Sequence, residues 1–311
     1  MGLALLGAVS QGILWGIMVL GVFITYKLLD IADLTVDGSF ALGGCVCAVM
    51  VVGGMDPLLA IVVAMVAGMV AGAVTGFLHT VFEIPAILAG ILTQIGLWSI
   101  NLRIMGKSNT PLLKNETIFS SVTDATGLST NVGAIIVGVV IAVVIIVALY
   151  WFFGTEIGSA CRATGNNEAM VRALGVNTKV TKMIALTLSN GLVGLSGALI
   201  CESQKYADIG MGTGAIVIGE VLWRVLPGAK LHAFGGRLTS AVVGSVVYFL
   251  IRAIVLQMGM DANDMKLLSA IIVALALCVP VVWEKYQLRR AYARASRELP
   301  ETEGATTEGG R

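Results

Sequence analysis

Charge is scarce in this sequence, and motifs that carry chemistry are absent. Charged residues make up 13% of its 311 residues, against about 25% in a typical soluble domain, while 57% are hydrophobic and the mean hydropathy is +0.91. There is no phosphate-binding GxxxxGKS/T motif, no HExxH and no CxxC, and the two histidines stand alone. The sequence therefore predicts an integral membrane protein that is not an enzyme and has no cofactor, metal or nucleotide site of its own.

Net charge and cysteine content exclude further classes. A net charge of +1 gives no reason to expect a nucleic-acid partner. The cysteines are odd in number and four of them lie in apolar runs, where cysteine acts as a small hydrophobic residue; they are Cys45, Cys47, Cys161, Cys201 and Cys278. No disulfide framework is expected. The N-terminus has no basic region and no small-residue cleavage site, so we expect the first span to be retained.

Long apolar runs can be counted against the roughly 20 residues that a helix needs to cross a bilayer. Five are clean: Leu3–Tyr26, Pro57–Phe82, Ile84–Leu102, Val132–Thr155 and Met183–Cys201. Four are weaker: Ser39–Met55, Ile209–Trp223, Leu238–Met260 with Arg252 inside it, and Leu267–Trp283. The prediction is an all-α integral membrane protein, a polytopic helical bundle with about 8–10 membrane segments, some of them broken or re-entrant. A transmembrane domain over 1–284 and a disordered, cytoplasmic tail over 285–311 complete the expected organisation.

One polar island, 154–182, separates two apolar runs and reads GTEIGSACRATGNNEAMVRALGVNTKVTK. It carries the signals of a short helix. Asn166 or Asn167 can cap the N-terminus, Glu168 and Arg172 suit the first and last turns, and Gly175 can take a left-handed stop position. A capped helix on a loop between spans indicates a docking element for a partner outside the membrane.

Basic residues orient the chain. The island holds four of them and the tail five, which places both in the cytoplasm. The loop 106–131 then falls outside, and counting back places the N-terminus outside as well. Small residues at fixed spacing predict close packing of two spans; they are Ala64, Gly68, Gly72 and Gly76 in one run, and Gly191, Gly194 and Gly197 in another.

Polar residues inside apolar runs are candidates for function because they are costly in hydrocarbon. Asp33, Asp37 and Ser39 lie where an apolar segment starts late, after an acidic opening. This opening is either a broken helix facing a cavity or a cytoplasmic loop in which Asp37 or Ser39 caps the next helix.

A second polar set follows helical spacing. Gln94, Trp98 and Asn101 lie roughly on one face with Thr93, which suits either pathway lining or hydrogen bonding between helices. Glu83 is expected at the membrane interface, and Glu220 is expected near a segment end with a buried partner.

The run from Gly158 to Leu199 carries a resemblance: GSACRATGNNEAMVRALGVNTKVTKMIALTLSNGLVGLSGAL. It resembles the cytoplasmic loop and following helix of permease subunits in the branched-chain amino acid and ribose group of bacterial ABC importers. Further stretches resemble a narrower subfamily of tryptophan- or tyrosine-type permeases; they begin at Leu34 (LTVDGSFALGG), Ile84 (IPAILAGILTQIGLWSINLRIMG) and Asp261 (DANDMKLL). The run GMGTGAIVIGE from Gly210 is shorter than its family counterpart, which leaves open whether the seventh span is a half-helix or a truncated one.

The resemblance implies a multi-pass protein of the bacterial cell membrane that works by alternating access. Its partners would be a second permease subunit, as a homodimer, ABC ATPase subunits that bind ATP and Mg²⁺, an extracytoplasmic substrate-binding lipoprotein, and membrane lipid. The substrate would be a small polar solute, an amino acid, with an aromatic one such as tryptophan or tyrosine favoured. The coupling helix that docks on the ATPase would be built by Asn166, Asn167, Glu168, Met170, Val171, Arg172, Leu174 and Gly175. Its charged pair would face the ATPase, and Met170, Val171 and Leu174 would supply apolar contact.

The substrate pathway is expected along Asp37, Ser39, Gln94, Trp98, Asn101 and Glu220. Two other classes stay open. An ion-coupled secondary transporter would use intramembrane carboxylates, for which Glu83, Glu202 and Glu220 are candidates. A membrane-embedded enzyme would need clustered catalytic side chains, and two isolated histidines argue against it.

Overall fold

The structure is a computed structural model that describes residues 2–113, 115–127, 129–211 and 234–257. Within these residues seven helices are long and apolar enough to cross a membrane. They are α1 (Gly2–Val22), continued by a π-helix η1 (Phe23–Leu28), α2 (Thr35–Val52), α3 (Pro57–Thr80), α4 (Ala86–Met105), α6 (Thr130–Gly154), α9 (Thr178–Gln204) and α11 (Phe234–Gln257). The prediction of an all-helical, polytopic membrane protein is confirmed.

Each of the seven helices corresponds to one predicted segment. Helices α2, α9 and α11 begin four or five residues before the predicted segments, because a count of apolar residues leaves out polar first turns, whereas α3 ends two residues before the predicted Phe82. Helix α9, for example, begins five residues before the predicted Met183, since Asn177 accepts hydrogen bonds from the backbone amides of Lys179 and Val180. The prediction for 267–283 and nearly all of that for 209–223, including Glu220, lie outside the described residues, as does the tail 285–311.

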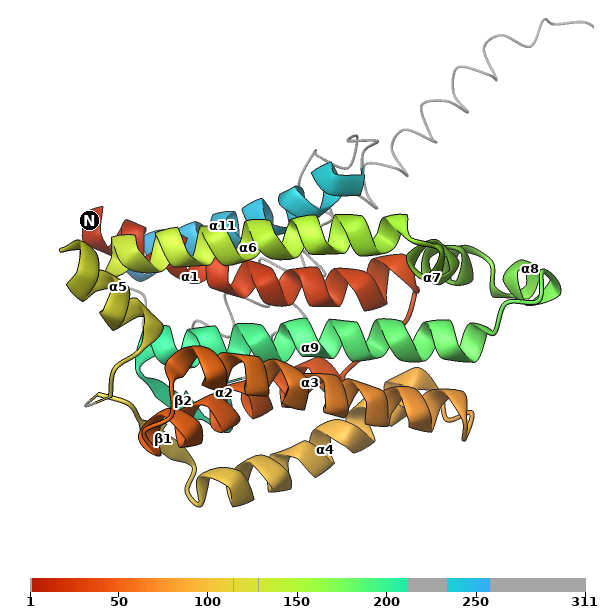
Figure 1. The fold of residues 1–311 in the computed structure, drawn as a ribbon, viewed down its shortest axis with the longest axis horizontal. Helices are drawn as coiled ribbons and strands as arrows, with labels where there is room; N and C mark the ends of the chain where they lie inside the picture. Colours follow the sequence, from red (N-terminus) through yellow and green to blue (C-terminus); the bar gives the residue numbers. More distant parts are fainter. Residues whose placement is uncertain (1, 114, 128, 212–233, 258–311) are drawn as a thin grey trace, which may run out of the picture.

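Figure 1 shows the long helices side by side, with appendages at the two ends of the bundle. At one end lie α7 (Glu156–Asn166) and α8 (Glu168–Ala173), both within the polar island. At the other end lie the start of α1, the helix α5 (Ile118–Thr126) and an antiparallel pair of short strands, β1 (Asn109–Pro111) and β2 (Tyr206–Asp208). The island and the loop 106–131 therefore lie at opposite ends, as the predicted orientation requires.

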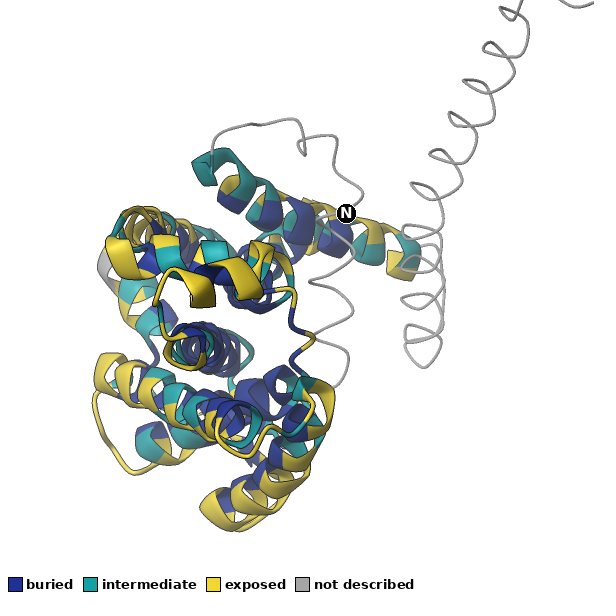
Figure 2. Cartoon of the chain, turned by 90° about the vertical axis from the view of Figure 1, so that its right-hand side faces the viewer, coloured by how far each residue is buried: buried dark blue, intermediate teal, exposed yellow. Residues whose placement is uncertain are grey.

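Helix α9 forms the centre of the bundle and is the most buried of the seven spans. Figure 2 looks at the α7 and α8 end and shows buried residues turned toward the middle and exposed ones toward the outside. Added methyl groups at Gly68 and Gly72 of α3 would overlap the backbone of Asn190 and Leu186. The predicted close packing of these two spans is thus confirmed, since only glycine allows such an approach.

The loop 106–131 is fastened to the far end of α9. Besides the β1–β2 pairing, Leu112 donates its backbone amide to the carbonyl of Lys205 at 2.8 Å. The buried Glu202 carboxylate accepts from the Ile118 amide at the start of α5, at 2.9 Å, and lies 3.5 Å from the Cys47 Sγ. Glu202 therefore holds a loop in place and is not a free intramembrane carboxylate.

The chain is broken between α1 and α2. Residues 29–34 are not helical, and within them Leu29, Ile31 and Asp33 are buried. Helix α2 begins at Thr35, against Thr75 of α3 and beside Asn190, near the middle of the 27-residue helix α9. The chain thus returns halfway into the bundle as non-helical backbone before α2 starts. This supports the broken-helix interpretation of the acidic opening, and neither Asp37 nor Ser39 caps α2.

Candidate functional site

The polar island folds into two short helices rather than one. Asn167 is the N-cap of α8 and accepts from the Met170 amide at 3.0 Å, and Gly175 takes the left-handed conformation, with φ of 85°. Both confirm the predicted helix signals. Asn166 belongs instead to the last turn of α7, which corrects its assignment to the coupling helix. The signal for α7 was present but not recognised: Thr155 caps it by accepting from the Gly158 amide.

Helix α8 presents an apolar face to the outside of the bundle. Met170 is 50% exposed and Leu174 is 74% exposed, and Ala169 and Ala173 on the same face are exposed too. Val171 is 2% exposed and points inward. Its predicted place on the outer contact surface is therefore wrong: it anchors α8, while the other residues form a surface that water covers in the isolated chain.

The charged pair on α8 is also used differently from the prediction. The Glu168 carboxylate accepts from the Arg172 Nη2 at 2.8 Å, from the Thr178 hydroxyl at 3.0 Å and from the Lys182 Nζ at 2.7 Å. The hydrogen bond from Lys182 holds the pKa of the Glu168 carboxyl below its usual value. Glu168 thus ties α8 to the start of α9 and is not turned outward, whereas Arg172 remains largely exposed.

Helix α7 connects the island to the broken span. A methyl group added at Gly165 would overlap the carbonyl of Leu28 and crowd the backbone of Leu29, the two residues where η1 ends and the non-helical segment 29–34 starts. On its other side α7 is hydrogen-bonded to α9 through the hydroxyls of Thr164 and Thr181, 2.9 Å apart. The island therefore contacts the backbone at the break directly.

A buried polar network closes the break. Asp33 accepts from the Thr35 amide at 2.9 Å through one oxygen and from the Asn190 side-chain amide at 2.7 Å through the other. The Asn190 carbonyl in turn accepts from the Ser39 hydroxyl at 2.7 Å. These groups are at most 5% exposed. The acidic charge of Asp33 thus meets the amino end of α2, where the helix dipole favours it.

A second chain of buried hydroxyls joins three helices at the same level. Thr35 of α2 lies 2.7 Å from the hydroxyl of Thr75 in α3, and Thr75 lies 3.0 Å from the hydroxyl of Thr93 in α4. For Thr93 the structure thus favours hydrogen bonding between helices over pathway lining. Asn190, the central residue of the network, was missed. The signal was its polar side-chain amide inside a Gly-rich span. It was overlooked because that span was interpreted only as a packing surface.

Four of the predicted pathway residues come together. Asp37 from α2 and Gln94, Trp98 and Asn101 from α4 line one small cavity of about 30 Å³, with Gly38, Ala41 and Ile209. Asn101 is 1% exposed, and its side-chain oxygen has no hydrogen-bond partner among the described residues. Trp98 is half exposed at the outer surface of α4. Ser39 does not line this cavity, because it faces Asn190 inside the bundle.

The remaining carboxylate candidates are accounted for where the structure describes them. Glu83 lies at the α8 end, exposed, with Lys179 Nζ 3.2 Å away, as expected for an interfacial residue. Glu202 fastens α5, and Glu220 lies outside the described residues. An ion-coupled mechanism therefore has no free buried carboxylate among the two described candidates.

These features define the class. Several membrane-spanning helices, with a buried non-helical stretch between the first two and a small cavity lined partly by polar side chains, are typical of a transport protein.

The family follows from comparison. The chain belongs to the family described as branched-chain amino acid transport system / permease component, whose profile matches residues 4–278. It is an ABC transporter permease and a multi-pass protein of the bacterial inner membrane. The resemblance in Gly158–Leu199 is thereby confirmed.

Curated relatives agree with this family. The chain is 34% identical over 272 residues to a tyrosine transport system permease protein of Clostridioides difficile, covering 86% of this chain and 88% of that protein. It is 30% identical over 278 residues to an uncharacterized protein of Rickettsia prowazekii, covering 88% and 96%. A ribose import permease protein of Bacillus subtilis is 27% identical over 226 residues, covering 69% and 65%. No solved structure matches the chain.

Proposed function

We propose that this chain is the transmembrane subunit of an ATP-driven importer that carries an aromatic amino acid, such as tyrosine, into the cytoplasm by alternating access. The observation that carries the proposal is the exposed apolar face of α8, which a permease without a nucleotide motif needs for docking an ATPase. The substrate class is supported by the relative that is named a tyrosine transport permease.

The ATPase docks on α8. Met170 and Leu174 supply apolar contact together with the exposed alanines, and Arg172 supplies the outward charge. ATP and Mg²⁺ are held by that subunit. At the opposite end, an extracytoplasmic binding protein delivers substrate above the β1–β2 pair and α5. The ATPase and binding protein are partners that permeases of this family have in general.

The pathway runs between two copies of the chain, beside the cavity of Asp37, Gln94, Trp98 and Asn101. Half of Trp98 is exposed, so this cavity opens on the surface that a second copy would complete. Residues 1–284 form the permease domain, with 154–182 as its coupling loop, and 285–311 form a cytoplasmic tail.

Transport needs a connection between the ATPase and the pathway. When the ATPase moves α8, α7 moves with it, because both are bonded to the start of α9. Gly165 then displaces Leu28 and Leu29, and the non-helical segment 29–34 passes this movement on to α2, whose residue Asp37 lines the cavity. The position of Asp37 in the cavity wall thus changes with the nucleotide state of the ATPase. The permease switches between two packed conformations.

The test compares Leu174→Asp with Leu113→Asp. The two leucines are 74% and 75% exposed but lie at opposite ends of the bundle. In cells that also express the ATPase and binding protein, uptake of radiolabelled L-tyrosine should fall about tenfold or more for Leu174→Asp, since a carboxylate buried in an apolar contact costs more than about 1.4 kcal/mol. Leu113→Asp, at the opposite end from α8, should associate with the ATPase normally, and both variants should insert to equal levels.

Two results would overturn the proposal. One is uptake that follows an ion gradient and persists without ATP, which would select the secondary transporter. The other is normal ATPase association by Leu174→Asp. Binding of tryptophan, tyrosine, branched-chain amino acids and ribose to the purified binding protein decides the substrate class separately.

A further inference from the structure

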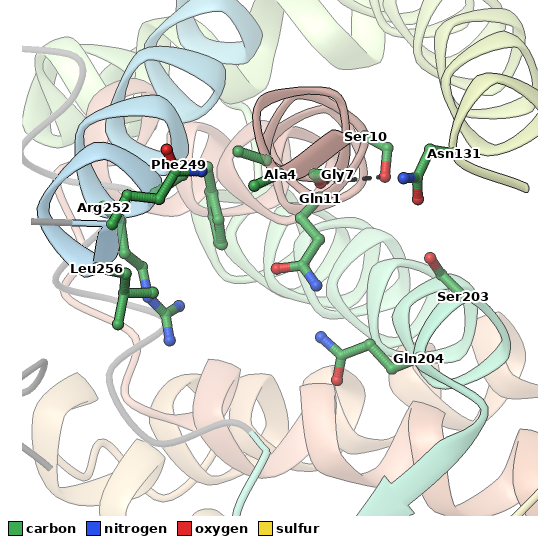
Figure 3. Close-up of a pocket in the computed structure, with 13 residues that line it drawn as sticks. Ala4, Gly7, Ser10, Gln11, Asn131, Ser203, Gln204, Phe249, Arg252 and Leu256 are labelled. Atoms are coloured by element: carbon green, nitrogen blue, oxygen red, sulfur yellow. Dashed lines mark hydrogen bonds between the residues drawn. The ribbon is translucent and has the colours of Figure 1, made fainter. Parts of the chain in front are cut away.

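A cavity of about 380 Å³ lies between α1, α9 and α11, at the end of the bundle away from α7 and α8. Figure 3 shows Gln11 of α1, Gln204 of α9 and Arg252 of α11 directed into it from three sides. Ser203 and Asn131 also line it. Its volume lies within the range of small-molecule sites, which is about 300–1,000 Å³. It is distinct from the cavity between α2 and α4.

The charge in this cavity is of one sign. Arg252 is the only charged residue in its lining, and it forms no ion pair with an acidic side chain in the part of the chain that the structure describes. Its guanidinium lies 5.8 Å from the centre of the Phe249 ring, which is itself in the lining. An arginine inside an apolar span is expensive and is retained for a function.

The lining fits one kind of ligand. A guanidinium offers paired N–H donors that match the two oxygens of a carboxylate. The amides of Gln11 and Gln204 have carbonyl oxygens that can accept from an ammonium group, and Phe249 and Leu256 offer apolar surface. A zwitterion with an aromatic side chain can bind the guanidinium, the amide carbonyls and the apolar surface at once. A sugar has no carboxylate to pair with the guanidinium.

We propose that this cavity is an entry site that binds the carboxylate of an amino acid through Arg252 before the solute passes on to the transport pathway. This inference rests on the proposed import of an amino acid, and it adds the group of the substrate that is recognised and the residue that recognises it. A phospholipid headgroup is the competing occupant, because Arg252 lies five residues before the end of α11 and could reach the membrane surface.

Binding can be measured without transport. The full chain carrying Ser203→Cys and Cys278→Ser is placed in phosphatidylcholine nanodiscs and labelled with a membrane-impermeant maleimide. Ser203 lines the cavity and the four other cysteines are free and buried, so the thiol introduced at position 203 reports on the cavity. L-Tyrosine at about ten times its Kd should slow labelling roughly tenfold, because only the unoccupied cavity reacts. Tyramine, which lacks the carboxylate, should not slow it.

The arginine is tested by two further variants. Arg252→Gln should abolish protection by L-tyrosine, and Arg252→Lys should restore part of it. Arg103→Gln is the matched control, because it removes the same charge from an exposed position near the same end of the bundle and should leave protection unchanged.

Three results overturn the inference. Equal protection by tyrosine and tyramine in the chain with Arg252 intact shows that no carboxylate is recognised, whatever the fate of the variants. Absence of protection by tyrosine in a chain that imports it excludes the entry site and leaves the proposed function standing. The third result is labelling that is slower in phosphatidylglycerol than in phosphatidylcholine nanodiscs only when Arg252 is present, with no protection by tyrosine. That result assigns the cavity to a lipid headgroup. Arg252-dependent protection supports the site even if uptake proves independent of ATP.

Discussion

The polar island at 154–182 and the break at 29–34 both interrupt apolar helices, but they are stabilised in different ways. The island uses charges at the surface, with Glu168 bonded to Arg172 and Lys182. The break uses buried groups, with Asp33 held by Asn190 and a helix amino end. Water screens the first set and is excluded from the second. An asparagine in the buried region is therefore expected to contribute more to stability than an asparagine in the exposed one.

The largest expected effect comes from one substitution made in both regions. Asn190→Ala leaves one of the two Asp33 carboxyl oxygens and the Ser39 hydroxyl without a buried hydrogen-bond partner, so we expect a loss of about 3–5 kcal/mol in the free energy of unfolding. Asn167→Ala removes an exposed helix cap and should cost only about 1 kcal/mol. Unfolding in mixed micelles with increasing sodium dodecyl sulfate measures both. Equal losses would remove the distinction between the regions.

An intermediate effect is expected where the two regions touch. Gly165→Ala places a methyl group against the Leu28 carbonyl, and the overlap should cost about 1–3 kcal/mol. Gly154→Ala is the control, because open space surrounds that position. Gly165→Ala should also lower ATP-dependent uptake at equal expression. A variant that is destabilised yet couples normally would show that α7 does not act on the break.

The smallest effect is expected at Glu168. Because Lys182 lowers the pKa of this carboxyl in the folded chain, its stabilisation is present above the pKa of an unfolded glutamate, about 4.3, and is lost as the pH falls through the lower folded value. Glu168→Gln should therefore cost less than about 1 kcal/mol at pH 7, and this cost should decline as the pH falls below the pKa of an unfolded glutamate. Glu83→Gln, in an exposed pair with Lys179, is the control. A cost that persists in acid would assign Glu168 a role other than ion pairing.

Much of the fold could be predicted from the sequence, because apolar length and small-residue spacing are local properties. The helix signals at Asn167 and Gly175 are local too, and both proved correct. The direction of each side chain on α8 was not predictable. Val171 and Glu168 face inward because α7 and α9 pack there, and that packing depends on residues distant in the sequence.

The candidate pathway shows the same limit. Helical spacing correctly grouped Gln94, Trp98 and Asn101, and the structure places Asp37, which was predicted separately, beside them. Ser39, only two residues after Asp37, turns to the opposite side of α2 and meets Asn190. Nothing local to either residue indicated that pair, since 151 positions separate them.

Helix α9 has a consequence for how the two membrane faces communicate. Its first turns hold α7 and α8, through Lys182 and Thr181, and its last turn holds the outer loop, through Glu202. With 27 residues it is a rigid rod roughly 40 Å long. Helices α7 and α8 at one end and α5 at the other are thus bonded to the same rigid helix, so a rotation of α9 would move both sets together. A fluorescent reporter on α5 would consequently register events that begin on the opposite side of the membrane.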